Sequence, residues 1–357
     1  MSGNGLGRHF PALAAALPCL ELAELPTPLE PAPALAATLG IGALAIKRDD
    51  RSSPLYGGNK VRKLDYLLAD ALARGCDSVV TYGSAGSNHA LATAVFATRL
   101  GLAAHAVLID QPPGPAVARK LRWLLHTGAH IHYASSYADS RRVAERLREH
   151  HPVAARCLYD IPWGGSSPLG ATGFVAAALE LVRQSDAPAD YLYVSGGTMG
   201  TAIGLSLGLR AAGWSTCVVA PRAVPQGTTD VERTVRVARE ANLALHAHDP
   251  AFPLFDDPLA QLELRPEFYG SGYAVPTPAS DEATALAARL HGISLESTYT
   301  AKAFAGLVTD ARAGRLTGQR VVYWHTANSA PYPPALNQID PAPLPAPLRH
   351  YLEAASP

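Results

Sequence analysis

The sequence has little of several features that would narrow its function at once. Its 30 basic and 30 acidic residues leave a formal net charge of +0, so neither nucleic acid nor a charged partner is indicated. No apolar run reaches the roughly 20 residues that a membrane span needs. The four cysteines, Cys19, Cys76, Cys157 and Cys217, lack metal-ligand spacing, which predicts no metal site and free thiols in a reducing, cytoplasmic compartment.

The order of apolar patterns predicts an α/β fold. A chain of 357 residues is too long for one ordinary core, so two domains are expected. Helical periodicity alternates with short buried runs, which predicts parallel sheets with right-handed crossovers. The proline-rich residues 249–272 are expected to form a surface excursion and residues 341–347 an extended tail. The predicted helices cover residues 64–73, 88–100, 116–127, 170–183, 201–212, 281–291 and 301–313, and the strands 41–47, 78–82, 104–109, 130–133, 191–194, 216–221 and 321–325.

A glycine turn at Gly57 and Gly58 delivers Lys60 to the start of a predicted helix. Glycine permits backbone angles that other residues resist, so such a turn can bring the lysine close to a planar ring. A lysine whose pKa is lowered can attack an aldehyde cofactor. Lys63 shares a helix face with Lys60 and suits a phosphate oxygen. The alternative is a helix start with solvated lysines.

A second glycine-rich turn follows the strand over residues 191–194 and opens the next helix. Backbone N–H groups at such a turn point at an anion, and the helix dipole favours negative charge there. The segment matches neither a Walker A loop nor a dinucleotide fingerprint, and the next strand ends without an acidic residue to hold a ribose. It therefore favours a plain phosphate cradle made of Ser195, Gly196, Gly197, Thr198, Met199, Gly200 and Thr201.

Polar residues at other strand ends complete the candidate site. In the turn before the helix over 88–100, the Ser87 hydroxyl could take a substrate carboxylate and Asn88 could donate to a ring oxygen, although Ser87 is also a good N-cap. Tyr273 and Tyr299 could stack on a flat ring or donate a proton, with ordinary packing as the alternative. His325 ends the last strand and could line the same crevice. This combination indicates a pyridoxal 5'-phosphate (PLP) enzyme.

The chain resembles the D-cysteine desulfhydrase / 1-aminocyclopropane-1-carboxylate (ACC) deaminase family of PLP enzymes. The matching segments run in order over nearly the whole chain and are residues 25–29, 47–50, 57–64, 87–89, 161–166, 168–170, 195–198 and 299–303. The resemblance implies a tryptophan-synthase-β-like fold (fold type II) with PLP between two domains. It places residues 1–62 and 170–357 in a large domain and residues 63–169 in a small inserted one. Members are commonly homodimers.

The resemblance also implies roles for individual residues. Lys60 would hold the cofactor and move protons, Lys63 and the turn at 195–201 would hold the phosphate, and Asn88 would contact the ring hydroxyl. Ser87 would handle the substrate carboxylate or a proton. The other implied positions are His89, Trp163 and Tyr273 at the substrate and Tyr299, Thr300 and His325 at the cofactor.

Thr300 and two departures from the family pattern bear on the reaction. ACC deaminases typically carry Glu where this chain has Thr300, so β-elimination from a small amino acid, giving a keto acid and ammonia, is predicted. ACC ring opening, β-replacement and racemisation stay open, as does a non-catalytic binding protein. Leu91 and Ala92 replace an Arg-Gln pair, and Ala327 and Asn328 replace two glycines, which leaves the substrate open.

Overall fold

The computed structural model describes residues 5–151, 157–228 and 231–353. Its contacts divide the chain into two compact units, one of residues 1–66 and 166–329 and one of residues 67–165 and 330–357. We call them unit 1 and unit 2. The division falls within helix α4 (Lys60–Ala73). Among the described residues no helix is long and apolar enough to cross a membrane.

Unit 1 is built on a sheet of six strands. Its order is β1-β2-β10-β7-β8-β9, with β1 antiparallel to β2 and every other pair parallel. The strands are β1 (Leu29–Pro31), β2 (Ala43–Lys47), β7 (Tyr191–Tyr193), β8 (Cys217–Pro221), β9 (Leu262–Arg265) and β10 (Arg320–Trp324). The centre of the sheet is apolar on both faces, as a parallel sheet between helical layers must be.

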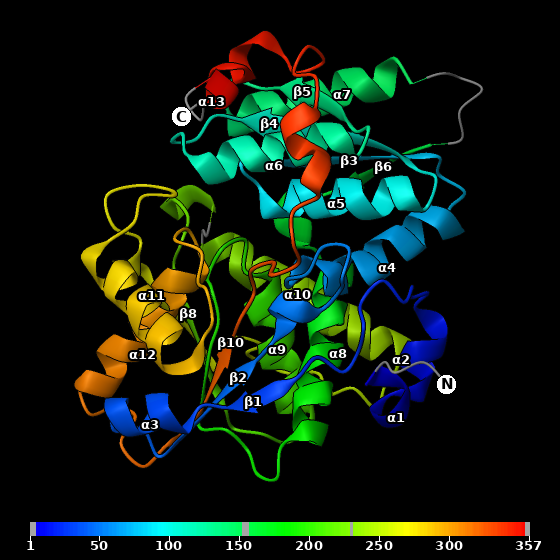
Figure 1. Ribbon diagram of the computed structural model, residues 1–357. Coiled ribbons are helices and arrows are strands. Elements are labelled where there is room, and N and C mark those ends of the chain that lie inside the picture. The colour runs from blue at the N-terminus through cyan, green and yellow to red at the C-terminus, as the bar shows by residue number, and fades with distance from the viewer. Residues whose placement is uncertain (1–4, 152–156, 229–230, 354–357) are drawn as a thin grey trace. The chain divides into compact units, whose positions relative to one another are not determined.

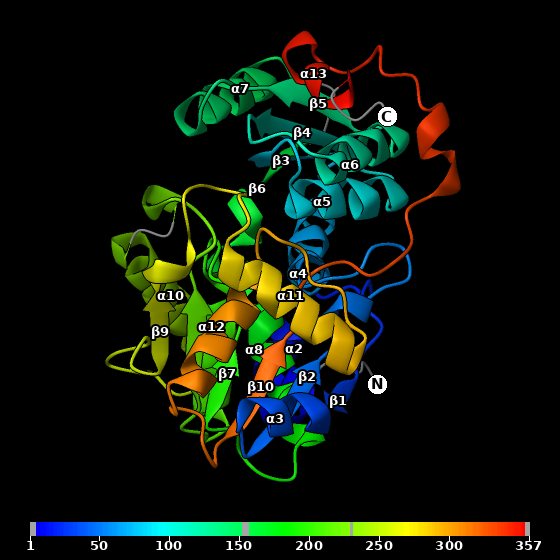
Figure 2. The same ribbon diagram turned by 60° about the vertical axis from the view of Figure 1, so that its left-hand side comes forward.

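Side-chain alternation along β10 shows why both faces are covered. Val321 and Tyr323 join one core and Val322 and Trp324 the other, as the two-residue period of a strand requires. The helices α3 (Pro33–Leu39), α11 (Pro278–His291) and α12 (Thr300–Arg312) cover the first face. The helices α8 (Pro168–Gln184), α9 (Gly200–Ala211) and α10 (Val231–His248) cover the second, as Figures 1 and 2 show.

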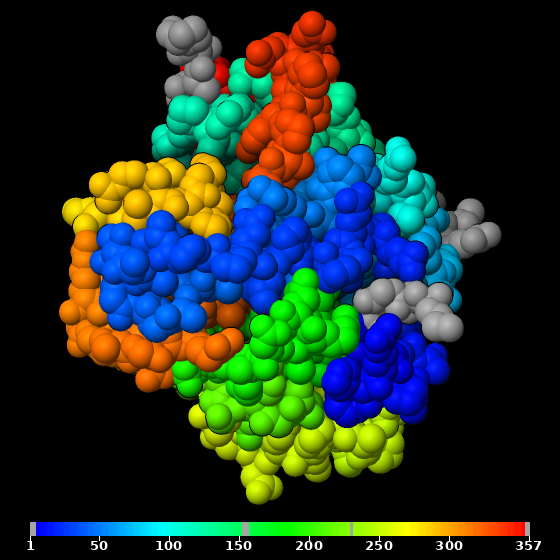
Figure 3. Space-filling model, turned by 60° about the horizontal axis from the view of Figure 1, so that its bottom comes forward, coloured from blue at the N-terminus to red at the C-terminus, as the bar shows by residue number. Residues whose placement is uncertain are grey.

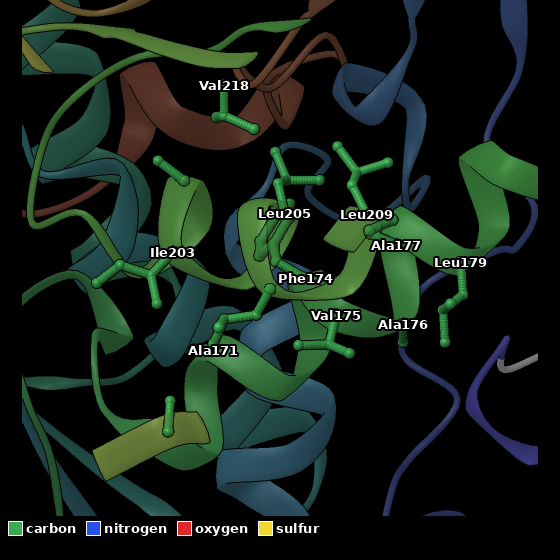
Figure 4. Packing of buried hydrophobic residues seen from close by; sticks show 14 of the residues in the cluster. Ala171, Phe174, Val175, Ala176, Ala177, Leu179, Ile203, Leu205, Leu209 and Val218 are labelled. Atoms are coloured by element: carbon green, nitrogen blue, oxygen red, sulfur yellow. The ribbon is translucent and has the colours of Figure 1, made fainter. Parts of the chain in front are cut away.

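Helices α8 and α9 approach closely because α9 carries a stripe of glycines. A Cβ on Gly204 would lie 2.3 Å from the Ala171 carbonyl oxygen, and one on Gly208 would lie 2.6 Å from the Ala178 Cβ. Without those Cβ atoms, Phe174 of α8 packs into the core with Leu205 and Leu209 of α9 (Figure 4). The contact fixes α9, whose first residue belongs to the turn at 195–201.

We expect Gly204→Ala to destabilise unit 1. The added methyl collides with backbone, which cannot rotate away, so the helices must separate at a cost of about 1–3 kcal/mol or more. Urea unfolding followed by circular dichroism measures the loss. Gly213→Ala is not a suitable control because its φ of 79° makes any side chain strained. Ala202→Gly in the same helix, expected to cost about 1 kcal/mol, sets the scale, and a Gly204→Ala loss below it would contradict the close contact.

The N-terminal helices belong to the α8 side of unit 1. Helices α1 (Leu6–His9) and α2 (Pro11–Ala16) place Leu6, Phe10 and Leu13 in the same core as Phe252. The rings of Phe10 and Phe252 lie 5.0 Å apart. Figure 3 shows the dark blue N-terminal segment beside green and yellow-green segments that are distant from it in the sequence, in agreement with the contacts of α1 with α8 and of α2 with α10.

Unit 2 is built on four parallel strands in the order β5-β4-β3-β6. These are β3 (Ser78–Ser84), β4 (Ala103–Ile109), β5 (His130–Tyr133) and β6 (Leu158–Ile161). Helices α5 (Asn88–Arg99) and α6 (Pro115–His126) pack together, and α7 (Tyr137–Glu149) packs on β4. The short helix α13 (His350–Glu353) contacts α6.

The structure corrects the expectations for the cysteines and for residues 249–272. Cys76 and Cys157 form a disulfide rather than free thiols, with Cα atoms 4.4 Å apart, because each precedes one of the paired strands β3 and β6. Their sequence separation of 81 residues hid this proximity. Residues 249–272 are not only a surface excursion, since they contain β9, which pairs with β8.

The expected domain boundaries lie near the contact-based division at the insertion. The sequence predicted domain boundaries after residues 62 and 169, and the contacts place the boundaries between the units after residues 66 and 165. The C-terminus differs: residues 330–357 group with unit 2 rather than with the large domain. The segment expected as an extended tail ends at a single-turn helix over Ala346–Leu348, and Leu344 is buried.

Three histidines on neighbouring strands of unit 2 predict a loss of stability in acid. His105 Nδ1 lies 3.0 Å from His132 Nε2, and its ring stacks on His130 with centroids 4.8 Å apart. Burial, followed by the charges of His132, His130 and His151, lowers the pKa of His105 to about 4. In the unfolded chain His105 takes up a proton near the ordinary pKa of about 6.5, whereas in the folded unit it stays neutral until the pH approaches about 4.

We expect the free energy of unfolding to fall as pH drops from about 6.5 to about 4 because of this cluster. His105→Gln should flatten that part of the profile, whereas His126→Gln, whose residue lies at the end of α6 outside the cluster, should leave it unchanged. Urea unfolding at several pH values measures both. Identical profiles for wild type and His105→Gln would contradict the assignment.

Candidate active site

The turn that presents Lys60 is fixed by backbone contacts that only glycine permits. A Cβ on Gly57 would lie 2.0 Å from the Asp50 carbonyl oxygen, and Gly58 has a φ of 97°. The Gly57 N–H donates to Asn328 Oδ1 at 2.6 Å and the Gly58 N–H to the Asp49 carbonyl at 2.8 Å. Asn328, one of the residues that depart from the family pattern, thus holds the turn itself.

A buried ionic network holds the residues on both sides of the same turn. The Arg62 guanidinium donates to both Asp49 oxygens at 2.8–3.0 Å and to both Glu180 oxygens at 2.9–3.1 Å. Lys47 Nζ donates to Glu180 at 2.5 Å, and Trp324 Nε1 donates to Asp49 at 2.7 Å. Because Arg62 lies two residues after Lys60, this network holds the first turn of α4 in place.

Lys60 is the first residue of α4, and its surroundings suit it as a nucleophile. Burial among protein atoms lowers the pKa of its ammonium to about 8. Much more of the amine is then uncharged near neutral pH than at the ordinary pKa of about 10.4. An uncharged amine can attack a carbonyl or accept a proton, which a solvated lysine at neutral pH cannot do readily.

Lys63 lies one turn further along α4, at the predicted anion cradle. Its Nζ donates to Ser166 Oγ at 3.1 Å, and Ser166 Oγ lies 2.7 Å from Thr198 Oγ1. The Gly200 N–H also reaches Ser166 Oγ, at 3.1 Å. Burial, then the charges of Lys60 and Arg233, keeps the pKa of Lys63 well below its usual range. An anion placed here would be favoured because it relieves that electrostatic penalty.

The turn over residues 195–201 lies close against Ser166 and Lys63, an approach that glycine at position 200 permits. A Cβ on Gly200 would lie 2.6 Å from Ser166 Oγ and 3.0 Å from Lys63 Nζ. Met199 has a φ of 64° and is the N-cap of α9 without a side-chain cap. Ser195 Oγ is buried with no hydrogen-bond partner among the described residues. Such a helix N-terminus with open donors is an anion site.

The two tyrosines of the prediction meet in unit 1. Tyr273 and Tyr299 place their hydroxyls 2.9 Å apart, and the Tyr299 ring passes 3.4 Å from the position of a Cβ on Gly197. Burial, followed by Tyr273, raises the pKa of Tyr299 well above its usual range. The Tyr299 hydroxyl therefore stays protonated beside the cradle and can donate a hydrogen bond.

Thr300 and His325 have partners within the protein. The Thr300 hydroxyl accepts from the Glu296 N–H at 2.7 Å and donates to the Glu296 carbonyl at 3.0 Å. His325 Nε2 lies 3.1 Å from the Ser294 carbonyl, and Nδ1 lies 3.9 Å from Asp50. Burial lowers the pKa of His325 in spite of Asp50. Both residues are buried neutral groups.

The remaining predicted residues belong to unit 2. Ser87 is the N-cap of α5, and its Oγ accepts from the Ala90 N–H at 3.2 Å, which leaves the hydroxyl proton for another acceptor. Ser87 and Asn88 are partly exposed and His89 is buried. Trp163 stacks on Tyr82 with ring centroids 6.1 Å apart, and its Nε1 has no partner among the described residues. Leu91 and Ala92, further along α5, are buried.

Unit 1 thus gathers Lys60, Lys63, the 195–201 turn and Tyr299, whereas unit 2 carries Ser87, Asn88, His89 and Trp163. Sequence reasoning named neither Ser166, which joins Lys63 to Thr198, nor Asn59, whose Nδ2 donates to Thr201 Oγ1 at 3.0 Å. Both lie in segments that the resemblance already included, so a search for hydroxyls and amides in those segments could have found them.

A family model described as pyridoxal-phosphate dependent enzyme matches residues 20–327. The chain belongs to this family. A D-cysteine desulfhydrase of Salmonella typhi is 36% identical over 321 residues, covering 87% of this chain and 94% of that protein. The enzyme of Salmonella newport (strain SL254) is 35% identical over the same length and coverage. The protein is therefore a PLP enzyme of the ACC deaminase / D-cysteine desulfhydrase group.

Solved structures of PLP enzymes share the fold. A crystal structure titled as an ACC deaminase homologue matches with a TM-score of 0.79 and 30% identity, covering 95% of this chain and 99% of that one. Threonine deaminase isoform 2 from Solanum lycopersicum, at a TM-score of 0.63 and 19% identity over 94% of this chain and 87% of its own, shares the fold alone. The predicted α/β class, fold type II and PLP dependence are confirmed.

The residues of unit 1 fit PLP. A phosphate needs positive charge and hydrogen-bond donors, and the cradle offers Lys63, the start of α9 and the Ser195 hydroxyl, which has no hydrogen-bond partner among the described residues. An aldehyde needs an amine of lowered pKa, and Lys60 has one. Among the described residues no cluster of three His, Cys, Asp or Glu side chains could hold a metal ion.

Proposed function

We propose that this enzyme eliminates a β-substituent from a small amino acid and releases a keto acid and ammonia, with D-cysteine as the reference substrate. The observation that carries the proposal is Lys60, an amine with a pKa of about 8 on a turn held by Asp49 and Asn328 beside an anion cradle. The 36% identity to a D-cysteine desulfhydrase supports the choice of substrate.

Each residue of the cradle has a distinct task in this proposal. Lys63, Ser166, Thr198 and the start of α9 hold the phosphate. When bound, PLP supplies an electron sink for the carbanion formed at the substrate α-carbon. Lys60 would hold the cofactor, and its amine would accept the α-proton of the substrate. Tyr299, kept protonated by burial, would donate a hydrogen bond to the substrate while its oxygen shares a hydrogen bond with the Tyr273 hydroxyl.

The substrate side of the proposal rests on unit 2. The Ser87 hydroxyl has its proton free to donate, because its oxygen accepts the Ala90 N–H, so it suits a carboxylate. Asn88 would donate to the ring hydroxyl, and Trp163 Nε1 would offer a further donor. We also propose that the enzyme is a homodimer, which sedimentation of the purified protein tests.

Thr300 is the basis for preferring elimination to ring opening. Its hydroxyl is bound to the backbone of Glu296, and the Glu296 carboxylate is taken up by N–H groups at the start of α12, so the side chain at position 300 would offer the ring nitrogen a neutral group rather than a carboxylate. A neutral neighbour leaves that nitrogen less firmly protonated and the electron sink weaker, which suits departure of a good leaving group. ACC deamination is the second candidate, because an ACC deaminase homologue is 30% identical.

The deciding experiment is the visible spectrum of the purified enzyme with PLP while D-cysteine, L-cysteine, D-serine and ACC are added in turn. With D-cysteine we expect a spectral change and equal amounts of pyruvate, ammonia and sulfide, one water being consumed. Ammonia and 2-oxobutyrate from ACC alone would replace the proposal by the second candidate. No visible band with added PLP, or no response to any of the four, would contradict the proposed reaction.

Thr300→Glu tests the argument about the ring nitrogen. The added carboxylate should raise activity on ACC relative to D-cysteine, and Thr300→Gln, which has the same length without charge, should not. The ratio of the two kcat/KM values is the measurement. If the ratio is the same in wild type and both variants, Thr300 does not select the reaction.

A further inference from the structure

The turn that carries Ser87 and Asn88 is hydrogen-bonded to β4, to α6 and to the loop between them. The Gly86 N–H donates to Gln111 Oε1 at 2.8 Å, and the Ala85 N–H donates to the Ile109 carbonyl at 2.9 Å. Lys120 Nζ of α6 donates to the Gly86 carbonyl at 3.2 Å. Both backbone groups of the residue before Ser87 therefore have partners on the β4–α6 side of unit 2.

Gln111 is in turn fixed by a tyrosine from the C-terminal segment. The Gln111 N–H donates to the Tyr351 hydroxyl at 2.8 Å, and that hydroxyl lies 2.8 Å from the Gln111 carbonyl and 3.2 Å from Asp110 Oδ1. Tyr351 is 1% exposed. The hydroxyl oxygen accepts the Gln111 N–H, and its single proton reaches either the Gln111 carbonyl or Asp110 Oδ1, so one hydroxyl fixes the backbone of this loop.

Gln111 packs so closely against Gly86 that a side chain at position 86 would crowd it. A Cβ on Gly86 would lie 3.0–3.1 Å from the amide nitrogen and oxygen of Gln111 and 3.2 Å from Val117 Cγ2. The amide plane therefore lies directly against the backbone of the turn. The Gly86 N–H donates to Gln111 and is therefore not available to bind a substrate. Substrate binding by this turn would depend on Ser87 and Asn88.

We propose that Tyr351 and Gln111 are positioning residues for the substrate turn: Tyr351 orients Gln111, and Gln111 sets the path of Gly86 and so the direction of Ser87 and Asn88. The proposal rests on the function proposed above. It needs only contacts within unit 2, where all of these residues lie. Neither residue touches the substrate, so losing either should affect substrate binding more than cofactor attachment.

The test uses the PLP-loaded enzyme and its best amino-acid substrate. Tyr351→Phe removes one hydroxyl, and we expect KM to rise about three- to tenfold with a smaller change in kcat and an unchanged visible band. Gln111→Leu should act in the same direction and further, whereas Gln111→Glu, which keeps an acceptor for Gly86, should lie nearer to wild type. Tyr133→Phe is the control, since its hydroxyl binds Asp110 at 2.6 Å but not Gln111.

A second readout does not depend on activity. Amide hydrogen exchange of the peptide containing residues 83–90 should become faster in Tyr351→Phe and Gln111→Leu and stay as in wild type in Tyr133→Phe. Unchanged KM and unchanged exchange in both variants would overturn the proposal, and so would a lowered melting temperature with KM unchanged. A wild type inactive on every amino acid would instead overturn the proposed function, even if the exchange results came out as expected.

Discussion

Replacing Lys60 by alanine is expected to lower turnover by more than about a thousandfold. The variant loses the amine that both attaches the cofactor and removes the α-proton. Lys63 cannot take over, because its Nζ is bound to Ser166 in the cradle. Steady-state kinetics with D-cysteine measures the loss. Mass spectrometry after borohydride reduction should find PLP attached to the wild type and none attached to the variant.

Lys302→Met serves as the matched control for Lys60→Ala. Lys302 is also a buried lysine of unit 1, but its Nζ donates to the Tyr269 carbonyl and it has no task in the proposed reaction. We expect this variant to keep covalent PLP and most of the activity. Near-wild-type turnover of Lys60→Ala, in a preparation that melts as the wild type does, would refute the assignment of Lys60.

Arg62→Met is expected to cause the largest loss of stability, about 3–5 kcal/mol. Asp49 and Glu180 are each at most 1% exposed, and Arg62 supplies the bidentate donors that both receive. Removing Arg62 leaves two buried carboxylates with one neighbouring ammonium, that of Lys47. Urea unfolding measures the change. The turn at Gly57 should loosen as well, so PLP affinity should fall.

The free energy of unfolding of the same variant should depend less on pH in acid than that of the wild type. Burial alone would raise the pKa of Glu180, but the Arg62 charge and its hydrogen bonds lower it to about 2. In the wild type this contribution to stability is full above the unfolded pKa near 4.5 and disappears as pH falls toward 2. Without Arg62 the pKa of Glu180 is no longer held down to the same extent, so the variant should be less stable at neutral pH but should lose less stability than the wild type as pH falls from about 4.5 toward 2.

Arg74→Met is the control for Arg62→Met. Arg74 follows the end of the same helix and pairs with Asp70, but its side chain is 66% exposed. An exposed pair contributes at most about 1 kcal/mol because water screens it. Equal losses for the two variants would contradict the importance of burial. A loss below about 1 kcal/mol for Arg62→Met would contradict the network as the anchor of the turn.

Local signals in the sequence predicted most of the backbone structure around the candidate residues of both units. The glycine turn before Lys60, the strand-turn-helix at 195–201 and the N-cap at Ser87 each depend on neighbours within a few residues, where turn geometry and helix capping decide the structure. Periodicity likewise predicted most strands and helices, because each face of the unit 1 sheet has its own apolar core.

What the sequence did not reveal depends on contacts between distant residues. Lys63 and Ser166 are 103 residues apart, and Arg62 and Glu180 are 118 apart. Pairing with β8 makes β9 a strand in a segment whose prolines predicted a loop. Cys76 and Cys157 meet only because β3 and β6 are neighbours. No local sequence pattern marks any of these contacts, so only the three-dimensional structure could identify them.

The composition of unit 2 from two separate stretches has a consequence for biosynthesis. Gly86 is made early, whereas Tyr351, which fixes its partner Gln111, is made near the end of the described chain. Before the ribosome has synthesised Tyr351, residues 67–165 can already form their sheet, but the turn at Gly86 lacks the contact of Tyr351 with Gln111. A gene fragment that encodes only this stretch should therefore yield a folded sheet whose turn at Gly86 is less ordered than in the whole enzyme.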